Sequence, residues 1–318
     1  MALDISRAAD SMMRLDDVLA AFDADPPSVR SEETRNRAAG IMARLALDRE
    51  CVANAALAEI EQGFTDDRMI DDGASDNAKS GTLADRRYGP QVLMLGEPRP
   101  GWFLRANIWP AQSDYALRAS GDTAFSYGLA HDHNFDFLTI GYHGPGYVSD
   151  YYEQDYDALA GYRGEPARLR FIERSALHKG RILYYRKHRD VHCQYPPEQL
   201  SISLNLMFTA PEQHWYDQYR HDLDSDRIDG IVSHGASDVL LRLAVEAELD
   251  EGLELAETVL HLHPSGRLRG VALDALHRHL SDEPQAQARL LERAMQSDSA
   301  LVAGQVRQLA LTHSRDDL

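Results

Sequence analysis

The chain has 318 residues, which is long enough for more than one compact unit and for a sizeable hydrophobic core. Its 51 acidic side chains outnumber its 33 basic ones, and the net charge of −18 disfavours nucleic acids and anionic membrane surfaces as partners. No apolar run approaches the roughly 20 residues of a membrane span, the N-terminal residues lack the apolar core of a signal peptide, and two cysteines give no disulfide framework. We therefore expect a cytoplasmic protein.

The first 64 residues are expected to be helical. The segments "SMMRLDDVLAAF" and "NRAAGIMARLALDRECVANAALAEIEQGF" repeat apolar residues at a spacing of three and four, and Asp25-Pro26-Pro27 separates them. The stretch over 65–90 is polar and rich in turn-forming residues, which is typical of a linker or a mobile loop.

The sequence over 91–210 changes to short runs of β-forming residues between turn signals, such as "WFLRANIWP", "DFLTIGYHG" and "LSISLNLMF". Strands at this spacing favour an antiparallel barrel or sandwich. We interpret 211–236 as a polar connection. Over 237–318 apolar residues return to helical spacing in short segments, which resemble a small α-solenoid similar to HEAT repeats. An ordinary helical bundle stays open as the alternative.

Two histidines in the segment "AHDHNFDFLTIGYHGPG", His131 and His133, could bind one metal ion. On a strand, residues two apart point to the same face, whereas on a helix they diverge by roughly 200°. The other two H-x-H pairs, in "LHLHPSG" and "ALHRHL", lie in helical sequence, but β-forming residues follow His133. This pair is therefore predicted to share one face of a strand. A structural pair without a metal is the alternative.

A third ligand is expected later in the chain, in "GRILYYRKHRDVHCQYPPEQLSISLNLMF". We predict His192, which precedes the loop at Pro196-Pro197. His188 is its rival, because residues four apart on a strand share a face. Asp190 has the same parity and could orient an imidazole, which metal-bound histidines usually need.

These two motifs together resemble the cupin superfamily, in which one motif holds H-x-H and a later one, starting at a glycine, holds the last histidine before an alternating strand. Gly180, His192 and "SISLNL" are spaced most like the JmjC-type branch. The "HDH" without a following acid is similar to the thiol-dioxygenase branch, whose iron is held by three histidines. The resemblance implies an α+β multidomain protein. Its antiparallel β-barrel (a double-stranded β-helix) would lie between the N-terminal helices and the C-terminal helical segment.

The resemblance also implies Fe(II), with O₂ as cosubstrate, held by His131, His133 and His192. Neutral imidazoles by themselves suit iron, zinc, copper and nickel equally. A cosubstrate role for 2-oxoglutarate stays open. The lysine and arginine that usually bind it have no clear match in the sequence, and Arg105, Lys179 and Lys187 are candidates only by position.

The candidate catalytic residues are Tyr142 and Tyr184, from a dense tyrosine population in which one hydroxyl could stabilise an oxygen intermediate, and Arg105, a candidate by its position. His143 is expected in a turn near the mouth of the barrel. By parity, Asp132 and Asp136 are expected on the face opposite the histidines, solvated or bonded to arginine, and Cys193 is expected to be inert packing.

The sequence thus predicts a mononuclear non-haem iron oxygenase acting on a small-molecule or peptide substrate, for example an amino acid. Two alternatives remain. One is a metal-dependent isomerase or lyase on the same barrel. The other is a non-enzymatic helical-repeat adaptor with a degenerate barrel.

Overall fold

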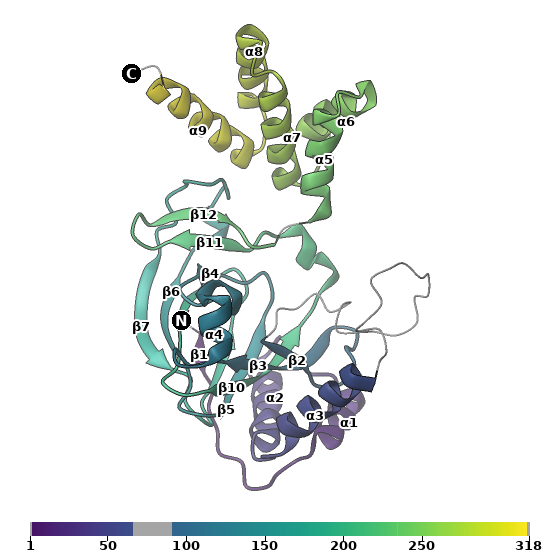
Figure 1. Cartoon of the computed structure of the whole chain (residues 1–318), viewed down its shortest axis with the longest axis vertical. Coiled ribbons are helices and arrows are strands. Elements are labelled where there is room, and N and C mark those ends of the chain that lie inside the picture. Colours follow the sequence, from purple (N-terminus) through teal and green to yellow (C-terminus); the bar gives the residue numbers. More distant parts are fainter. Residues whose placement is uncertain (1, 66–90, 234, 317–318) are drawn as a thin grey trace. The chain divides into compact units, whose positions relative to one another are not determined.

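The computed structural model describes residues 2–65, 91–233 and 235–316 (Figure 1). Two six-stranded antiparallel sheets and several helices confirm the predicted α+β content. Apart from Thr65, the predicted linker over 65–90 lies outside the described residues. The chain divides into two compact units: 1–129 with 135–153 and 171–211, and 130–134 with 154–170 and 212–318.

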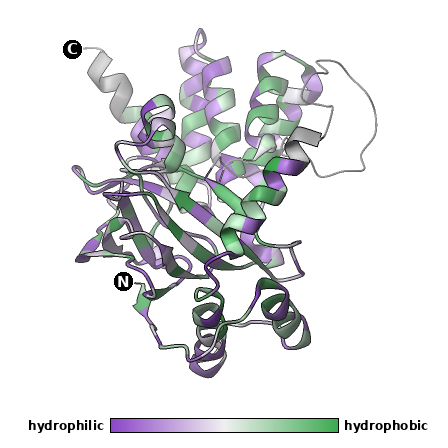
Figure 2. Ribbon diagram, turned by 60° about the horizontal axis from the view of Figure 1, so that its bottom comes forward, coloured by the Kyte–Doolittle hydropathy of each residue, from purple (hydrophilic) through white to green (hydrophobic). Residues whose placement is uncertain are grey.

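The first sheet carries the apolar faces on which the fold is built. Its strand order is β1-β8-β5-β10-β3-β2, with β1 at Leu3–Asp4, β8 at Ile182–Tyr185, β5 at Phe137–His143, β10 at Ser201–Phe208, β3 at Trp102–Trp109 and β2 at Val92–Met94. Both faces of this sheet are buried, because apolar residues occupy successive positions in its central strands. In Figure 2 apolar residues (green) run along several of the strands.

The N-terminal helices cover one face of the first sheet. They are α1 (Leu15–Ala24), α2 (Glu32–Leu45) and α3 (Cys51–Thr65). The second predicted helical run is therefore two helices. Phe22 and Met42 belong to one buried cluster with Leu138 and Leu204 of the sheet. At the start of α2, Ser31 and Thr34 form a capping box that satisfies backbone donors of the first turn.

The second sheet has the order β12-β11-β4-β9-β6-β7. Its strands are β4 (Ala130–His131), β6 (Val148–Glu153), β7 (Arg170–Ala176), β9 (Asp190–Tyr195), β11 (Tyr219–Asp222) and β12 (Arg227–Ile231). The hairpin of β11 and β12 corrects our interpretation of 211–236 as a polar connection. Tyr219 and His221 are buried, and the charged Arg220 alternates with them.

A second buried cluster fills the other face of the first sheet. It joins Phe137 of β5 and Tyr185 of β8 to Tyr151 of β6 and to the nearby Tyr147. The rings of Phe137 and Tyr185 stack with centroids 4.4 Å apart. In β8, Leu183 and Tyr185 belong to this cluster, while Ile182 and Tyr184 belong to the cluster under the N-terminal helices. We call the face of the first sheet that this second cluster covers, opposite the N-terminal helices, the inner face.

The C-terminal segment is helical, as predicted. Its helices are α5 (Ala236–Glu246), α6 (Asp250–Leu262), α7 (Gly266–His279), α8 (Pro284–Met295) and α9 (Ala300–Asp316). They have a core of their own, in which α7 packs against each of the other four helices. Short helices also occur at α4 (Tyr115–Ser120), and as 3₁₀ turns at Asp122–Phe125, Tyr156–Ala158 and Pro211–Trp215.

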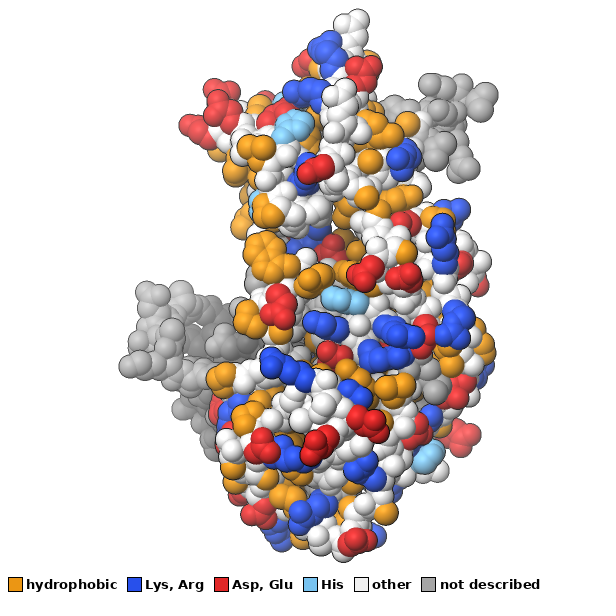
Figure 3. All heavy atoms as spheres, turned by 180° about the vertical axis from the view of Figure 1, so that it is seen from behind, with side chains coloured by type: hydrophobic (Ala, Val, Ile, Leu, Met, Phe, Trp, Pro, Cys, Tyr) orange, Lys and Arg blue, Asp and Glu red, His pale blue; other side chains and the backbone are white. Residues whose placement is uncertain are grey.

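The predicted closed barrel does not appear among the described strands, which form two sheets instead. Among the described helices, none combines the length and the apolar character needed to cross a membrane. Basic and acidic side chains are interspersed on the face seen in Figure 3. Ion pairs form among the described residues, such as Arg186 with Glu153 at 2.8 Å.

Candidate metal centre

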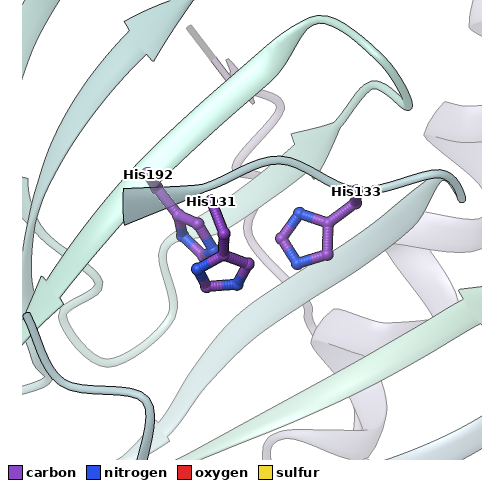
Figure 4. A group of neighbouring side chains, drawn as sticks. All are labelled: His131, His133 and His192. Carbon is purple, nitrogen blue, oxygen red and sulfur yellow. The ribbon is translucent and has the colours of Figure 1, made fainter. Parts of the chain in front are cut away.

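The structure brings together the three histidines that the sequence singled out (Figure 4). One ring nitrogen from each of His131, His133 and His192 lies within 4.8 Å of the corresponding nitrogens of the other two. All three side chains are buried, at 7%, 7% and 2% exposure. His131 ends β4, His133 follows two residues later, and His192 lies in β9, the neighbour of β4 in the second sheet.

The rings of His131 and His133 lie together, although only His131 is in a strand. Their centroids are 4.9 Å apart. Asp132 between them is fully buried, and it accepts hydrogen bonds from the Gln154 side chain and the Tyr219 backbone amide. This corrects the expectation of a solvated or arginine-bonded Asp132. Burial raises the pKa of the Asp132 carboxyl to about 7.

His192 is held by two tyrosines that the sequence did not single out. Its Nδ1 lies 3.1 Å from the Tyr185 hydroxyl, which in turn donates to the Tyr151 hydroxyl at 3.3 Å. His192 Nε2 lies 3.2 Å from the amide nitrogen of Gln194, which can only donate, so Nε2 accepts and the Tyr185 oxygen accepts from Nδ1. This assigns the imidazole proton to Nδ1 and leaves the lone pair on Nε2, the tautomer that a metal requires. Desolvation raises the pKa of both phenols, so they remain neutral hydrogen-bond donors.

The two tyrosines predicted to be catalytic lie on the other face of the first sheet. The Tyr142 hydroxyl donates to the backbone oxygen of Asp48 at 2.7 Å, and the Tyr184 hydroxyl donates to Asp136 at 2.8 Å. Both belong to the cluster under the N-terminal helices. The error is one of strand parity: Tyr185, one residue after Tyr184, faces the histidine.

Arg105 belongs to the inner face by its strand parity. It alternates with Leu104 and Ala106, which face the N-terminal helices, and it shares its side of β3 with Phe103 and Trp109. In register it pairs with Asn205 of β10. A guanidinium at this position is suited to an anionic group of a ligand.

The remaining candidates occupy other positions. His188 lies in the turn between β8 and β9, with a left-handed φ of 62°, and is not on a strand as we had assumed. His143 is exposed at the end of β5, and Lys179 and Lys187 are exposed. Asp190 forms an ion pair with Arg186 at 2.6 Å, while Tyr185 provides the orienting contact to His192.

His221 is a further buried histidine that the sequence did not single out. It is 5% exposed, and burial, with a smaller contribution from His131, lowers its pKa to about 4. Asp226 acts in the opposite direction. The only sequence signal was the alternation of Tyr219 and His221 in "YRHD".

We predict that acid destabilises the fold through His221. The unfolded histidine binds a proton near pH 6.5 but the folded one only near pH 4. The stabilisation is therefore complete above pH 6.5 and is lost as the pH falls towards 4, by up to about 3 kcal/mol. Chemical denaturation at several pH values gives the free energy of unfolding as a function of pH. Between pH 6.5 and 4 this free energy should fall less steeply with pH for His221→Leu than for the wild type. Equal slopes in the two proteins would contradict the prediction.

The donor set fits a metal ion of the first transition series. Three neutral imidazoles leave coordination positions open, and they suit iron, zinc, copper or nickel. The Nδ1 contact from His192 to Tyr185 supplies the outer hydrogen bond that orients a metal-bound histidine.

Comparison with known proteins gives only distant similarity. No protein-family model and no curated protein matches the chain. Among solved structures, a hydroquinone 1,2-dioxygenase in complex with Cd²⁺ and 4-hydroxybenzonitrile is 11% identical, with a TM-score of 0.26, over 43% of this chain and 82% of its own. A hydroquinone 1,2-dioxygenase from a Sphingomonas species with 4-hydroxybenzoate bound is 10% identical, with a TM-score of 0.26, over 40% and 71%. A DMSP lyase from Ruegeria pomeroyi is 12% identical, with a TM-score of 0.24, over 67% and 82%.

TM-scores this low do not establish a common fold or activity. The two antiparallel sheets and the three-histidine cluster are compatible with the resemblance to cupins. The HEAT-like repeat over 237–318 stays a prediction.

Proposed function

We propose that the chain is a mononuclear non-haem iron oxygenase, with Fe(II) held by His131, His133 and His192. The observation that supports this proposal is the convergence of three buried imidazole nitrogens within 4.8 Å of one another. Buried imidazoles gathered in this way would repel one another if protonated, and a cation satisfies their lone pairs. O₂ would be the cosubstrate, and the substrate an amino acid or a peptide-like molecule.

The chain's own residues would position the ligands and exclude water. Tyr185 and Tyr151 keep the His192 ring oriented, and their raised pKa values keep them protonated as donors. Aromatic residues of the inner face, including Trp109 and Phe137, provide an apolar wall. Arg105 would bind a carboxylate of the substrate. Bound Fe(II) would supply the redox chemistry that lets O₂ react, and oxidation of the substrate would provide the electrons.

A second candidate function is a metal-dependent isomerase or lyase on the same site. The observation that favours it is the donor set itself, because three imidazoles bind zinc or nickel as well as iron. An adaptor with no metal is the third alternative.

Metal analysis of protein purified without oxygen, followed by oxygen uptake, tests the proposal. We expect iron bound by the wild-type chain and lost in His131→Ala and in His133→Ala, with both variants still folded. Oxygen consumption with candidate amino acids, measured with and without 2-oxoglutarate, would support the oxygenase. Zinc or nickel without oxygen uptake would favour the isomerase or lyase, and the absence of any bound metal would overturn both.

A further inference from the structure

The side-chain amide of Gln194 lies beside His192 and has no assigned role. Gln194 is two residues after His192 in β9, so both side chains point to the same face. It is 4% exposed. The segment "HCQ" therefore repeats, on β9, the spacing of the two donors in "HDH".

The amide occupies the position that a metal on His192 would need. Its Nε2 lies 3.2 Å from Nε2 of His192. Because an amide nitrogen can only donate, the His192 Nε2 atom is the acceptor, and the Gln194 amide donates to its lone pair. A metal binds that lone pair at roughly 2.0–2.1 Å. The amide nitrogen and a metal cannot both occupy it, so Gln194 must reorient when a metal binds.

The amide oxygen of Gln194 is the atom that could bind the metal. Among the described residues, Oε1 of Gln194 has no hydrogen-bond partner, although the side chain is buried. A buried amide oxygen without a partner is costly and rare. Rotating the amide by 180° exchanges nitrogen and oxygen with almost no other movement. The rotated side chain presents an oxygen lone pair where it had presented an N–H donor.

We propose that Gln194 is a fourth protein ligand of the metal, through its amide oxygen. The inference rests on the proposed metal binding at His192. Three imidazoles and one amide oxygen leave two positions open in a six-coordinate ion, enough for a substrate and a small second ligand. The same four donors would complete a tetrahedral zinc site and leave no open position. Gln194 thereby favours a six-coordinate metal such as iron over zinc as the catalytic ion.

Cobalt(II) binding tests this role without relying on turnover. We would titrate metal-free full-length protein with Co²⁺ and record both the affinity and the visible absorption spectrum, which reports coordination number. Gln194→Leu, which removes both polar atoms, should weaken binding at least about tenfold and change the spectrum. Gln194→Glu, which keeps an oxygen at the same reach and adds a charge, should bind more tightly than wild type.

The matched control is Gln91→Leu. Gln91 is partly buried, and its Oε1 atom, like that of Gln194, lacks a hydrogen-bond partner among the described residues, but it is not on β9. This variant should bind Co²⁺ as the wild type does. Circular dichroism checks the folding of each variant, and Gln194→Glu retains the test if Gln194→Leu does not fold.

Two outcomes would overturn the role of Gln194 alone. If Gln194→Leu binds Co²⁺ as tightly as wild type, or more tightly, with an unchanged spectrum, Gln194 is only a cap that the metal displaces. If Gln194→Glu binds no more tightly, an oxygen at this position does not reach the metal. If wild-type protein itself binds no Co²⁺, the metal centre fails, and the inference fails with it.

Discussion

The His192→Ala variant is expected to lose its bound metal and all turnover. The substitution removes one of three converging imidazoles, together with the contacts to Tyr185 and Gln194. Loss of an outer hydrogen bond alone costs roughly 10- to 100-fold in metal affinity, so loss of a ligand should cost more than roughly 100-fold. Elemental analysis of purified protein and a competition titration would measure it.

The control for this variant is His188→Asn. His188 lies in the turn with a positive φ, a conformation that asparagine tolerates better than most residues. We expect unchanged metal content and nearly unchanged stability. Metal loss in His188→Asn with retention in His192→Ala would show that the third ligand is misassigned.

The second large effect is expected from Tyr185→Phe. The change removes the hydroxyl that accepts from His192 Nδ1 and donates to Tyr151, so the imidazole loses its fixed orientation and tautomer. Metal affinity, measured by the same competition titration, should fall roughly 10- to 100-fold, while the phenylalanine ring preserves the stacking on Phe137.

The adjacent residue provides the matched control. Tyr184→Phe removes a hydroxyl that bonds to Asp136 on the opposite face of the same strand. It should reduce the free energy of unfolding by about 1 kcal/mol and leave metal affinity unchanged. Equal losses of affinity in the two variants would mean that the tyrosines act through the stability of the sheet and not through the histidine.

The sequence was most informative where a short-range rule applied. The period of two along a strand predicted that His131 and His133 point the same way; the structure places their rings together, but His133 lies beyond the end of β4. Apolar spacing predicted the helices at both ends of the chain. The position of His192 before the proline loop distinguished it from His188 only through the resemblance to cupins.

Parity could not be assigned where both faces of a strand are buried. In "RILYYRK" two tyrosines follow each other, and apolar residues occupy both sides of β8, so no polar alternation shows which tyrosine faces inward. The position of Tyr151 near the histidine follows only from the register of β6 with β9, in which Tyr151 lies opposite His192. Such a long-range pairing leaves no mark in either segment alone.

The first strand of the chain protects the edge of the first sheet. Leu3 and Asp4 pair with Tyr184 and Leu183, and the backbone amide of Ile5 donates to Ile182 at 3.0 Å. An uncovered strand edge is a template for pairing between molecules. β8 also carries Tyr185, which contacts His192. Trimming or tagging the N-terminus would therefore expose the edge of β8 to self-association and would disturb the strand that orients the histidine. Protein intended for metal measurements should therefore carry its affinity tag at the other end.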